Sequence, residues 1–224
     1  MKVAWQPDLF DVAVEPRAAC AGARPERIAL DATSWVEVLR GWLAGADAVF
    51  AHLLSAAPWA QHERWMFDRM VIEPRLTAQA HTLAEAPHPS LAAAADALSD
   101  RYGVSYDHLW LNLYRDGRDS TAWHGDHISC RRDECVVPVL TLGATRRFLL
   151  KPRAGGRSVA LRPAAGDLVV MGGRCQRDWV HAVPKTAEAC GARISVNFQS
   201  SAQAQPVRRL VPSKASPVTS ESRS

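Results

Sequence analysis

The chain has 224 residues, of which 47% are hydrophobic and 22% are charged, and these proportions exclude a wholly disordered protein. Lysine and arginine number 27 against 23 acidic residues, and a formal charge of +4 is too small to indicate a nucleic-acid partner by itself. No apolar run approaches the roughly 20 residues that span a bilayer, so we expect no membrane association.

The five cysteines are scattered and odd in number, which favours free thiols over a disulfide framework. Cys130 and Cys135 are spaced closely enough to bind a metal ion, but no second pair accompanies them, and we expect free thiols here too. Free thiols are typical of the reducing cytosol. Asp8 and Asp11 interrupt the stretch where a signal peptide would be apolar, so we predict a cytoplasmic protein.

The first third of the chain predicts an extended lead-in followed by helices. Residues 1–30 mix Pro, Ala and Arg without periodicity, and we expect them to be extended. Asp31 or Thr33 offers an N-cap for a helix through WVEVLRGWL. A second, amphipathic helix is expected to start near Asp47.

The next segment predicts short strands and one more helix. Aromatic and β-branched residues in HERWMFDRMVIEPRLTAQA, closed by Pro74, indicate short strands with an irregular loop. Ser90 can cap a helix that ends at Gly103, a residue type common just after a helix.

From Tyr106 the pattern changes to an alternation of period two. Short apolar runs separated by glycine-rich turns predict a β-sandwich or jelly roll rather than alternating strands and helices. The runs are YDHLWLNLY, VVPVLTLG, RRFLLK, SVALR, DLVVMGG, WVHAV and ARISVNFQ. Residues 201–224 are polar and rich in Pro and Ser, and we expect a disordered tail.

A candidate metal site stands out in this β region. On a strand, His124 and Asp126 would face the same side, and His181 on a neighbouring strand would complete two imidazoles and one carboxylate. Such a facial triad leaves open positions and suits non-haem Fe(II) oxygenases. Taken alone, however, the spacing is common among eight histidines, and ordinary surface or core histidines remain the alternative.

Polar residues near the candidate triad indicate a ligand. Asn112 and Tyr114 share one face of an alternating strand, and Arg193 lies on the last predicted strand. An arginine that faces the interior of a β domain needs an anion, and a dicarboxylate would supply it through bidentate hydrogen bonds.

The order of four motifs resembles the AlkB family of Fe(II)/2-oxoglutarate dioxygenases over roughly residues 60–200. The motifs are NLYRDGRDSTAWHGD, TLGATRRFLLKP, GDLVVMGGRCQRDWVHAVPK and RISVNFQ. The resemblance implies an α+β fold, a double-stranded β-helix (jelly-roll) core with supporting N-terminal helices. On this basis the dioxygenase domain covers 31–200, with a substrate lid at about 62–85 and the catalytic jelly roll at about 106–200.

The same resemblance implies roles for individual residues. Fe(II) would be held by His124, Asp126 and His181, with 2-oxoglutarate and O2 as co-substrates. The implied reaction is oxidative dealkylation of N-alkylated nucleobases in DNA, with RNA as an alternative, by a monomer that repairs alkylation damage. The residues expected at 2-oxoglutarate are Asn112, Tyr114, Arg193, Ser195, Asn197 and Gln199, and those expected at the base are Trp65, Phe67, Arg69 and Trp123.

Three departures from the family pattern bear on these roles. Gln199 stands where the family has a second arginine, which predicts weaker co-substrate binding. Ile128, preceded by His127, replaces an acid that could favour a cationic base. Gln79 and Ala80 follow the lid motif where aromatic residues are usual, so base stacking is reduced unless other aromatics replace it.

A run of basic residues without acids extends from Ala144 to Arg162. Phosphate contact is one interpretation and a solvated hairpin face is the other. The residues that we predict at the nucleic-acid backbone are Arg146, Arg147, Lys151 and Arg153. Two other functions stay open: a related oxygenase that acts on a protein or small molecule, and a non-catalytic nucleic-acid-binding module.

Overall fold

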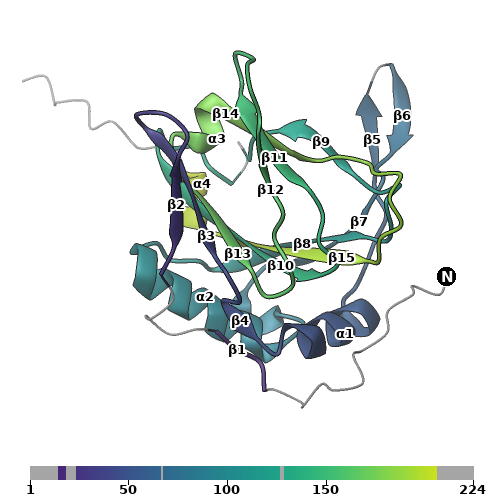
Figure 1. Ribbon diagram of the computed structural model, residues 1–224. Coiled ribbons are helices and arrows are strands. Elements are labelled where there is room, and N and C mark those ends of the chain that lie inside the picture. The colour runs from purple at the N-terminus through teal and green to yellow at the C-terminus, as the bar shows by residue number, and fades with distance from the viewer. Residues whose placement is uncertain (1–14, 19–23, 67, 127–128, 206–224) are drawn as a thin grey trace, which may run out of the picture.

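The computed structural model describes residues 15–18, 24–66, 68–126 and 129–205. In this part of the chain two antiparallel sheets face each other, and two helices cover the outside of the larger sheet (Figure 1). The predicted α+β fold with a jelly-roll core and N-terminal supporting helices is therefore confirmed.

The major sheet has seven strands and is antiparallel throughout, in the order β2-β3-β13-β10-β15-β8-β7. Its strands are β2 (Glu26–Ala29), β3 (Ser34–Leu39), β7 (Leu76–Ala80), β8 (His108–Tyr114), β10 (Cys135–Gly143), β13 (Leu168–Gly173) and β15 (Arg193–Gln199).

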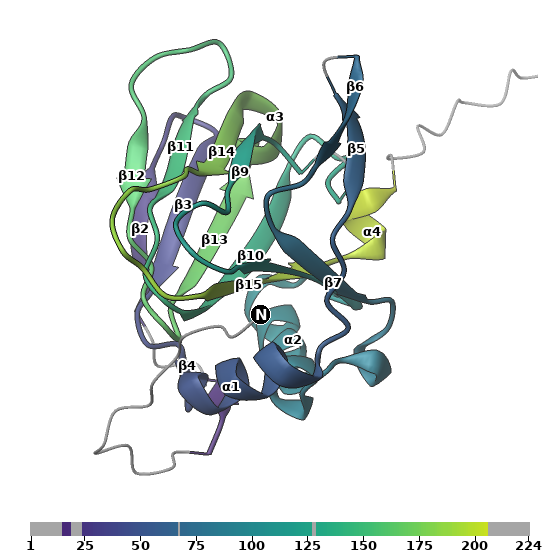
Figure 2. The ribbon, with the colours of Figure 1, turned by 90° about the vertical axis from the view of Figure 1, so that its right-hand side faces the viewer.

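The minor sheet has four strands in the order β12-β11-β14-β9. They are β9 (Thr121–His124), β11 (Phe148–Pro152), β12 (Val159–Leu161) and β14 (Trp179–Val183). Two small pairs complete the described strands: β1 (Arg17–Ala18) with β4 (Leu43–Ala44), and β5 (Glu63–Met66) with β6 (Arg69–Ile72). The β5–β6 hairpin projects away from the sheets (Figure 2). All seven apolar runs predicted after Tyr106 form strands.

The two faces of the major sheet differ in chemistry because side chains alternate along each strand. One face carries residues such as Leu111, Leu140 and Ile194, which are fully buried against α1 (Ala46–Ala56) and α2 (Pro89–Tyr102). The other face turns toward the minor sheet, and a second, smaller apolar core, which includes Phe148 and Trp179, fills part of that space. The remainder is lined by polar side chains, and the candidate site lies there.

Two of the three predicted helices are present. The helix expected near Asp47 is α1, which begins at Ala46 after Gly45 in the left-handed conformation (φ 66°). The second is α2, and Gly103 ends it in the left-handed conformation (φ 65°), as predicted. Its N-cap is His88, whose ring accepts from the Ser90 backbone N–H, so the capping residue differs from the one expected.

The helix predicted from Asp31 or Thr33 is wrong, because residues 34–39 form strand β3. The Asp31 carboxylate does accept from the backbone N–H groups of Thr33 and Ser34, at 2.8 and 2.7 Å, but it closes a turn before the strand. Alternating Val36 and Val38 then enter the core between the sheets.

Both ends of the predicted domain contain more structure than expected. Residues 26–29 of the expected lead-in form β2, and residues 201–204 of the expected tail form the short helix α4 (Ser201–Ala204). Gln203 of α4 is buried, and its side chain donates to the Val136 carbonyl and accepts from the Val136 N–H. The remaining short helices are η1 (Leu83–Glu85) and α3 (Cys175–Asp178).

The expectation of free thiols is wrong at one pair, because Cys130 and Cys135 form a disulfide. The loop between them returns on itself, so that the two Cα atoms lie 6.1 Å apart, which is within bonding range. Among the described residues, Cys175 is free and buried, and Cys190 is free and partly exposed.

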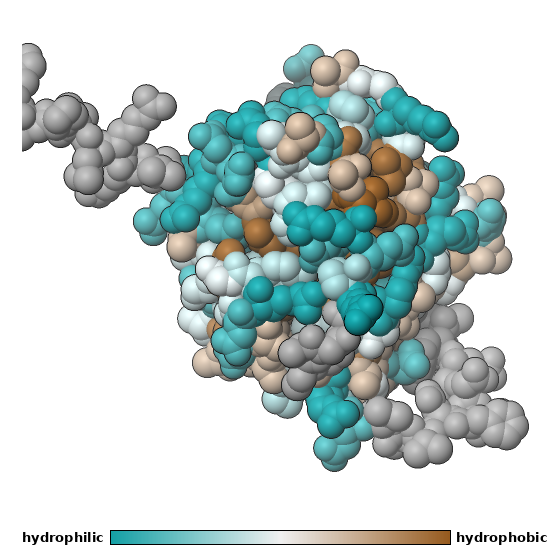
Figure 3. Space-filling model, turned by 60° about the vertical axis from the view of Figure 1, so that its left-hand side comes forward, coloured by the Kyte–Doolittle hydropathy of each residue, from teal (hydrophilic) through white to brown (hydrophobic). Residues whose placement is uncertain are grey.

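Hydrophilic side chains cover most of the molecular face seen in Figure 3, with hydrophobic residues visible between them. None of the helices in the described ranges combines the length and apolar character that crossing a membrane requires.

Candidate metal centre and co-substrate pocket

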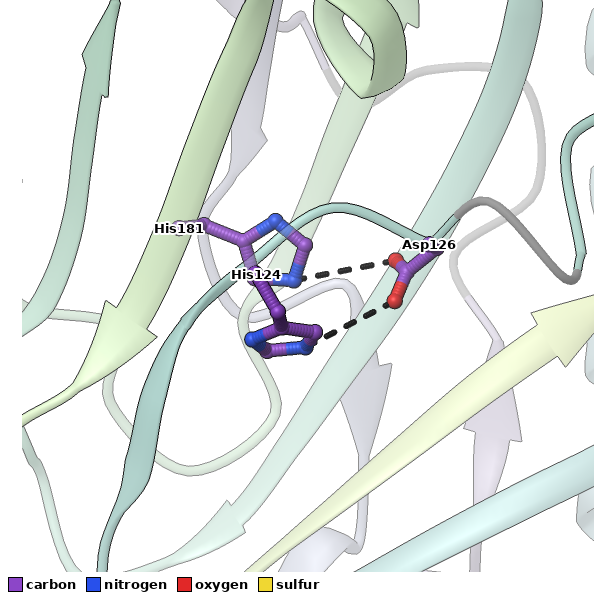
Figure 4. A group of neighbouring side chains, drawn as sticks. All are labelled: His124, Asp126 and His181. Atoms are coloured by element: carbon purple, nitrogen blue, oxygen red, sulfur yellow. Dashed lines mark ion pairs between the residues drawn. The ribbon is translucent and has the colours of Figure 1, made fainter. Parts of the chain in front are cut away.

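Two strands of the minor sheet and the loop after one of them bring the three predicted metal ligands together (Figure 4). His124 ends β9 and pairs directly with His181 on β14, so both imidazoles lie on the same face. Their ring centroids are 4.2 Å apart. The Asp126 carboxylate oxygens lie 3.6 Å from His124 Nε2 and 3.7 Å from His181 Nε2, and all ligand atoms lie within 4.8 Å of one another.

Asp126 reaches this point from outside the strand, although the sequence predicts it on the same strand as His124. Strand β9 ends at His124, and two hydrogen bonds then hold the backbone of Asp126. The backbone N–H of Asp126 donates to Oε1 of the buried Gln176 side chain at 2.9 Å. The backbone carbonyl of Asp126 accepts from the Cys130 N–H at 2.8 Å. Sequence reasoning missed Gln176, whose role depends on a contact between residues fifty positions apart.

Hydrogen bonding orients one histidine of the cluster, and burial favours the neutral form of the other, which is the form that a metal ion requires. The Nδ1–H of His124 donates to the Ala122 carbonyl at 2.8 Å, which leaves Nε2 as the ring nitrogen nearest Asp126. Burial lowers the pKa of His181 to about 4, against the opposing effect of Asp126. Two neutral imidazoles and one carboxylate form a donor set that suits Fe(II), so the residues fit the predicted ion.

Behind the metal cluster, the polar face of the major sheet contains an incompletely paired arginine. Arg193 is 1% exposed, and its Nη2 donates to the Thr141 hydroxyl at 3.0 Å. Its Nε and Nη1 have no hydrogen-bond partner in the part of the chain that the structure describes. Buried guanidinium groups normally use their donors, so this site fits a carboxylate ligand.

Further polar residues continue this pocket along β8 and β15. Tyr114 pairs in register with Arg193, and Asn112 pairs with Ser195, whose hydroxyl accepts from Asn112 Nδ2 at 3.2 Å. Asn197 instead donates to the Trp110 carbonyl at 2.9 Å, and Gln199 lies opposite His108. The structure thus places the six predicted co-substrate residues on two adjacent strands; their binding roles stay predictions. Thr141 was missed, although it alternates with apolar residues in VLTLG.

Of the four residues predicted to contact a base, the three that the structure describes are exposed. Trp65 on the β5–β6 hairpin is 65% exposed and Trp123, next to His124, is 40% exposed. Arg69 is exposed on the same hairpin. Phe67, like His127 and Ile128, lies outside the described residues.

The assignment of Arg146 to the nucleic-acid backbone is wrong, because its side chain is buried. It is 3% exposed and donates to the carbonyls of Asp116, Asp119 and Pro184 at 2.7–3.0 Å. Arg147 and Arg153 are exposed, and Lys151 Nζ lies 4.4 Å from the centroid of the Trp123 ring.

The model of the 2OG-Fe(II) oxygenase superfamily matches residues 61–199, which include the metal cluster and the polar face described above. The chain belongs to this superfamily. Membership implies Fe(II) and 2-oxoglutarate, and the His124, Asp126 and His181 cluster is the candidate iron site of the oxygenase.

Relatives of this oxygenase are named as dioxygenases and demethylases. The chain is 31% identical over 177 residues to alpha-ketoglutarate-dependent dioxygenase alkB homolog 3 of Bos taurus, covering 70% of the chain and 62% of the relative. It is 28% identical over 189 residues to DNA oxidative demethylase ALKBH2 of Arabidopsis thaliana, covering 67% and 60%. These matches therefore span about three fifths of each relative's length.

Solved structures support the fold of the oxygenase. An oxidoreductase of the 2OG-Fe(II) oxygenase family from Burkholderia pseudomallei matches with a TM-score of 0.50 and 18% identity, covering 74% of this chain and 84% of that one. A prolyl hydroxylase from Trichoplax adhaerens matches with a TM-score of 0.54 and 11% identity, covering 75% and 85%.

Proposed function

We propose that this oxygenase removes alkyl groups oxidatively from N-alkylated bases in DNA, with RNA as the alternative substrate. The observation that carries the proposal is the convergence of His124, Asp126 and His181 beside the incompletely paired, buried Arg193. A metal site and an anion site on facing sheets are what a reaction between a bound metal, a dicarboxylate and a third molecule requires.

In this proposal the protein binds and positions its reactants. Bound iron would supply the oxidation: O2 converts 2-oxoglutarate to succinate and CO2, and its second oxygen atom goes to the alkyl carbon, which then leaves as an aldehyde. His124, Asp126 and His181 would hold the iron from one side. Arg193 would hold a carboxylate of 2-oxoglutarate through its two free donors.

Two surface features support a nucleic-acid substrate. Trp65 and Trp123 expose aromatic rings on the hairpin and beside the metal ligands, and bases stack on such rings. A cleft of about 380 Å³ is rich in basic side chains. Its lining residues are Cys130, Arg131, Arg132, Arg177 and Asp178. Of the two relatives above, one is named an alpha-ketoglutarate-dependent dioxygenase and the other a DNA oxidative demethylase.

The test is an anaerobic loading with Fe(II) and 2-oxoglutarate, followed by air and a methylated single-stranded oligonucleotide. We expect formaldehyde and succinate in equal amounts from the methylated strand and no formaldehyde from the unmodified strand. Asp126→Asn should lower the rate by at least about 100-fold. The matched control Asp133→Asn, an exposed carboxylate further along the same β9–β10 connection, should stay within about twofold.

The same assay separates the other candidate functions. Exposed Gln79 and fully buried Ala80, where relatives would have aromatic residues, favour a related oxygenase for a protein or small molecule. Succinate without formaldehyde from any methylated strand would support that alternative. If the protein turns over no 2-oxoglutarate under any condition, the remaining candidate is a non-catalytic nucleic-acid-binding module. The cytoplasmic location and the monomeric state stay predictions.

A further inference from the structure

Arg75 contacts the predicted co-substrate pocket but was not among the residues singled out from the sequence. It lies directly before β7, the edge strand that pairs with β8. Its Nε donates to Asn112 Oδ1 at 3.0 Å, and its Nη2 lies 3.1 Å from Glu73 Oε2. The side chains of Arg75 and Glu73 are only 14% and 13% exposed, so solvent competes little for either contact.

These contacts determine the orientation of the Asn112 amide. Its Oδ1 accepts from both Arg75 Nε and Trp110 Nε1, the latter at 3.1 Å, and an amide oxygen has two lone pairs. Its Nδ2 gives one hydrogen to Ser195 Oγ. The hydrogen bonds among the described residues leave the second Nδ2 hydrogen unused, and that hydrogen is available to a ligand on the polar face.

We propose that Arg75 is a positioning residue for 2-oxoglutarate: it holds the Asn112 amide with the oxygen turned toward Arg75 and the second N–H left for a ligand on the polar face. This inference rests on the proposed function. The rigid guanidinium suits the task, because one planar group reaches Asn112 through Nε and Glu73 through Nη2 at once. Without Arg75 the amide oxygen loses a charged donor, and the amide can turn its oxygen toward a ligand carboxylate.

The test is equilibrium binding, which does not depend on turnover. Wild-type protein and variants are loaded with Mn²⁺ and titrated anaerobically with 2-oxoglutarate in a calorimeter. Arg75→Met, which keeps the length of the side chain, should raise the dissociation constant about tenfold. Arg75→Lys should do the same, because a single ammonium cannot make both contacts. The matched control Arg101→Met on helix α2 should leave the constant unchanged.

A double-mutant cycle shows whether Arg75 acts through Asn112. Arg75→Met combined with Asn112→Ala should bind 2-oxoglutarate no more weakly than Asn112→Ala alone, because the two residues act as one unit. Additive losses would overturn the inference, as would a dissociation constant within twofold of wild type for a folded Arg75→Met or Arg75→Lys. If wild-type protein does not bind 2-oxoglutarate at all, the proposed function fails and this inference fails with it.

Discussion

Two almost fully buried arginines lie near the Tyr114 ring, and their surroundings differ. Arg146 has its Cζ 6.0 Å from the ring centroid and donates to three backbone carbonyls. Arg193 has its Cζ 5.4 Å from the same centroid and donates to Thr141 alone, with Nε and Nη1 unpaired among the described residues.

This difference in hydrogen bonding marks Arg146 as a structural residue and Arg193 as the candidate binding residue. A buried donor without an acceptor is unfavourable, so a protein that carries one gains from a ligand that completes it. Arg146 already has its acceptors and ties the loop at residues 116–119 to Pro184. Arg193 lacks them and faces the pocket. Four substitutions test this distinction.

The largest expected effect is on stability, from Arg146→Ala. Three backbone carbonyls, one buried and two partly buried, would lose a charged donor. Each such bond is worth about 1.5–3 kcal/mol, so the free energy of unfolding should fall by about 3 kcal/mol or more. Urea denaturation measures this change. The neighbouring Arg147→Ala is the matched control, and a loss of equal size in both variants would contradict the structural role of Arg146.

Arg193→Leu should affect binding instead of stability. It removes one hydrogen bond and two unpaired donors from the interior, so the free energy of unfolding without ligand should change by less than about 1 kcal/mol. The affinity of the Mn²⁺-loaded protein for 2-oxoglutarate should fall on the order of 100-fold. A large loss of stability with unchanged affinity would reverse the assignment of the two arginines.

Thr141→Val tests the single hydrogen bond that the Arg193 side chain makes with the described residues. The substitution keeps the shape of the side chain and removes the hydroxyl that accepts from Nη2. The affinity for 2-oxoglutarate should weaken by about 1 kcal/mol, which is roughly fivefold, because Arg193 is held less firmly. Thr141→Ser keeps the hydroxyl and should retain wild-type affinity; equal losses in both variants would show that packing, not the hydrogen bond, matters.

Arg147→Ala should have the smallest effect, and only on nucleic-acid binding. Arg147 is exposed, so we expect a loss of about one phosphate contact, which lowers the slope of log affinity against log salt by about 0.7 for a single strand. Fluorescence anisotropy with an oligonucleotide at several salt concentrations measures this slope. An unchanged slope would make this arginine part of a solvated face.

The sequence predicts the site well where strand geometry decides it. Side chains alternate on a strand, so Asn112 and Tyr114 share a face, and a cross-strand partner brings His181 to His124, as the structure confirms. The same alternation, applied to Arg146, Arg147 and Phe148, would have placed the first and third inside. When the basic run from Ala144 to Arg162 is interpreted by charge alone, without the alternation of a strand, buried and exposed arginines cannot be told apart.

Other features depend on contacts that no local pattern encodes. Asp31 has the signature of a helix N-cap, yet the segment after it pairs with β13 as a strand. The separation of Cys130 and Cys135 does not reveal that the loop between them folds back. Arg75 meets Asn112 across 37 positions, and only the pairing of β7 with β8 brings them together.

The anchoring of Gln203 has a practical consequence for anyone who shortens this protein. Its side chain occupies both backbone hydrogen-bonding groups of Val136, and its carbonyl accepts from the Arg131 N–H. Cutting the chain after Gln199, where the last strand ends, would expose these groups at the start of strand β10 and remove the contact that α4 makes with the disulfide loop. Truncations intended for crystallisation should therefore retain residues through 205.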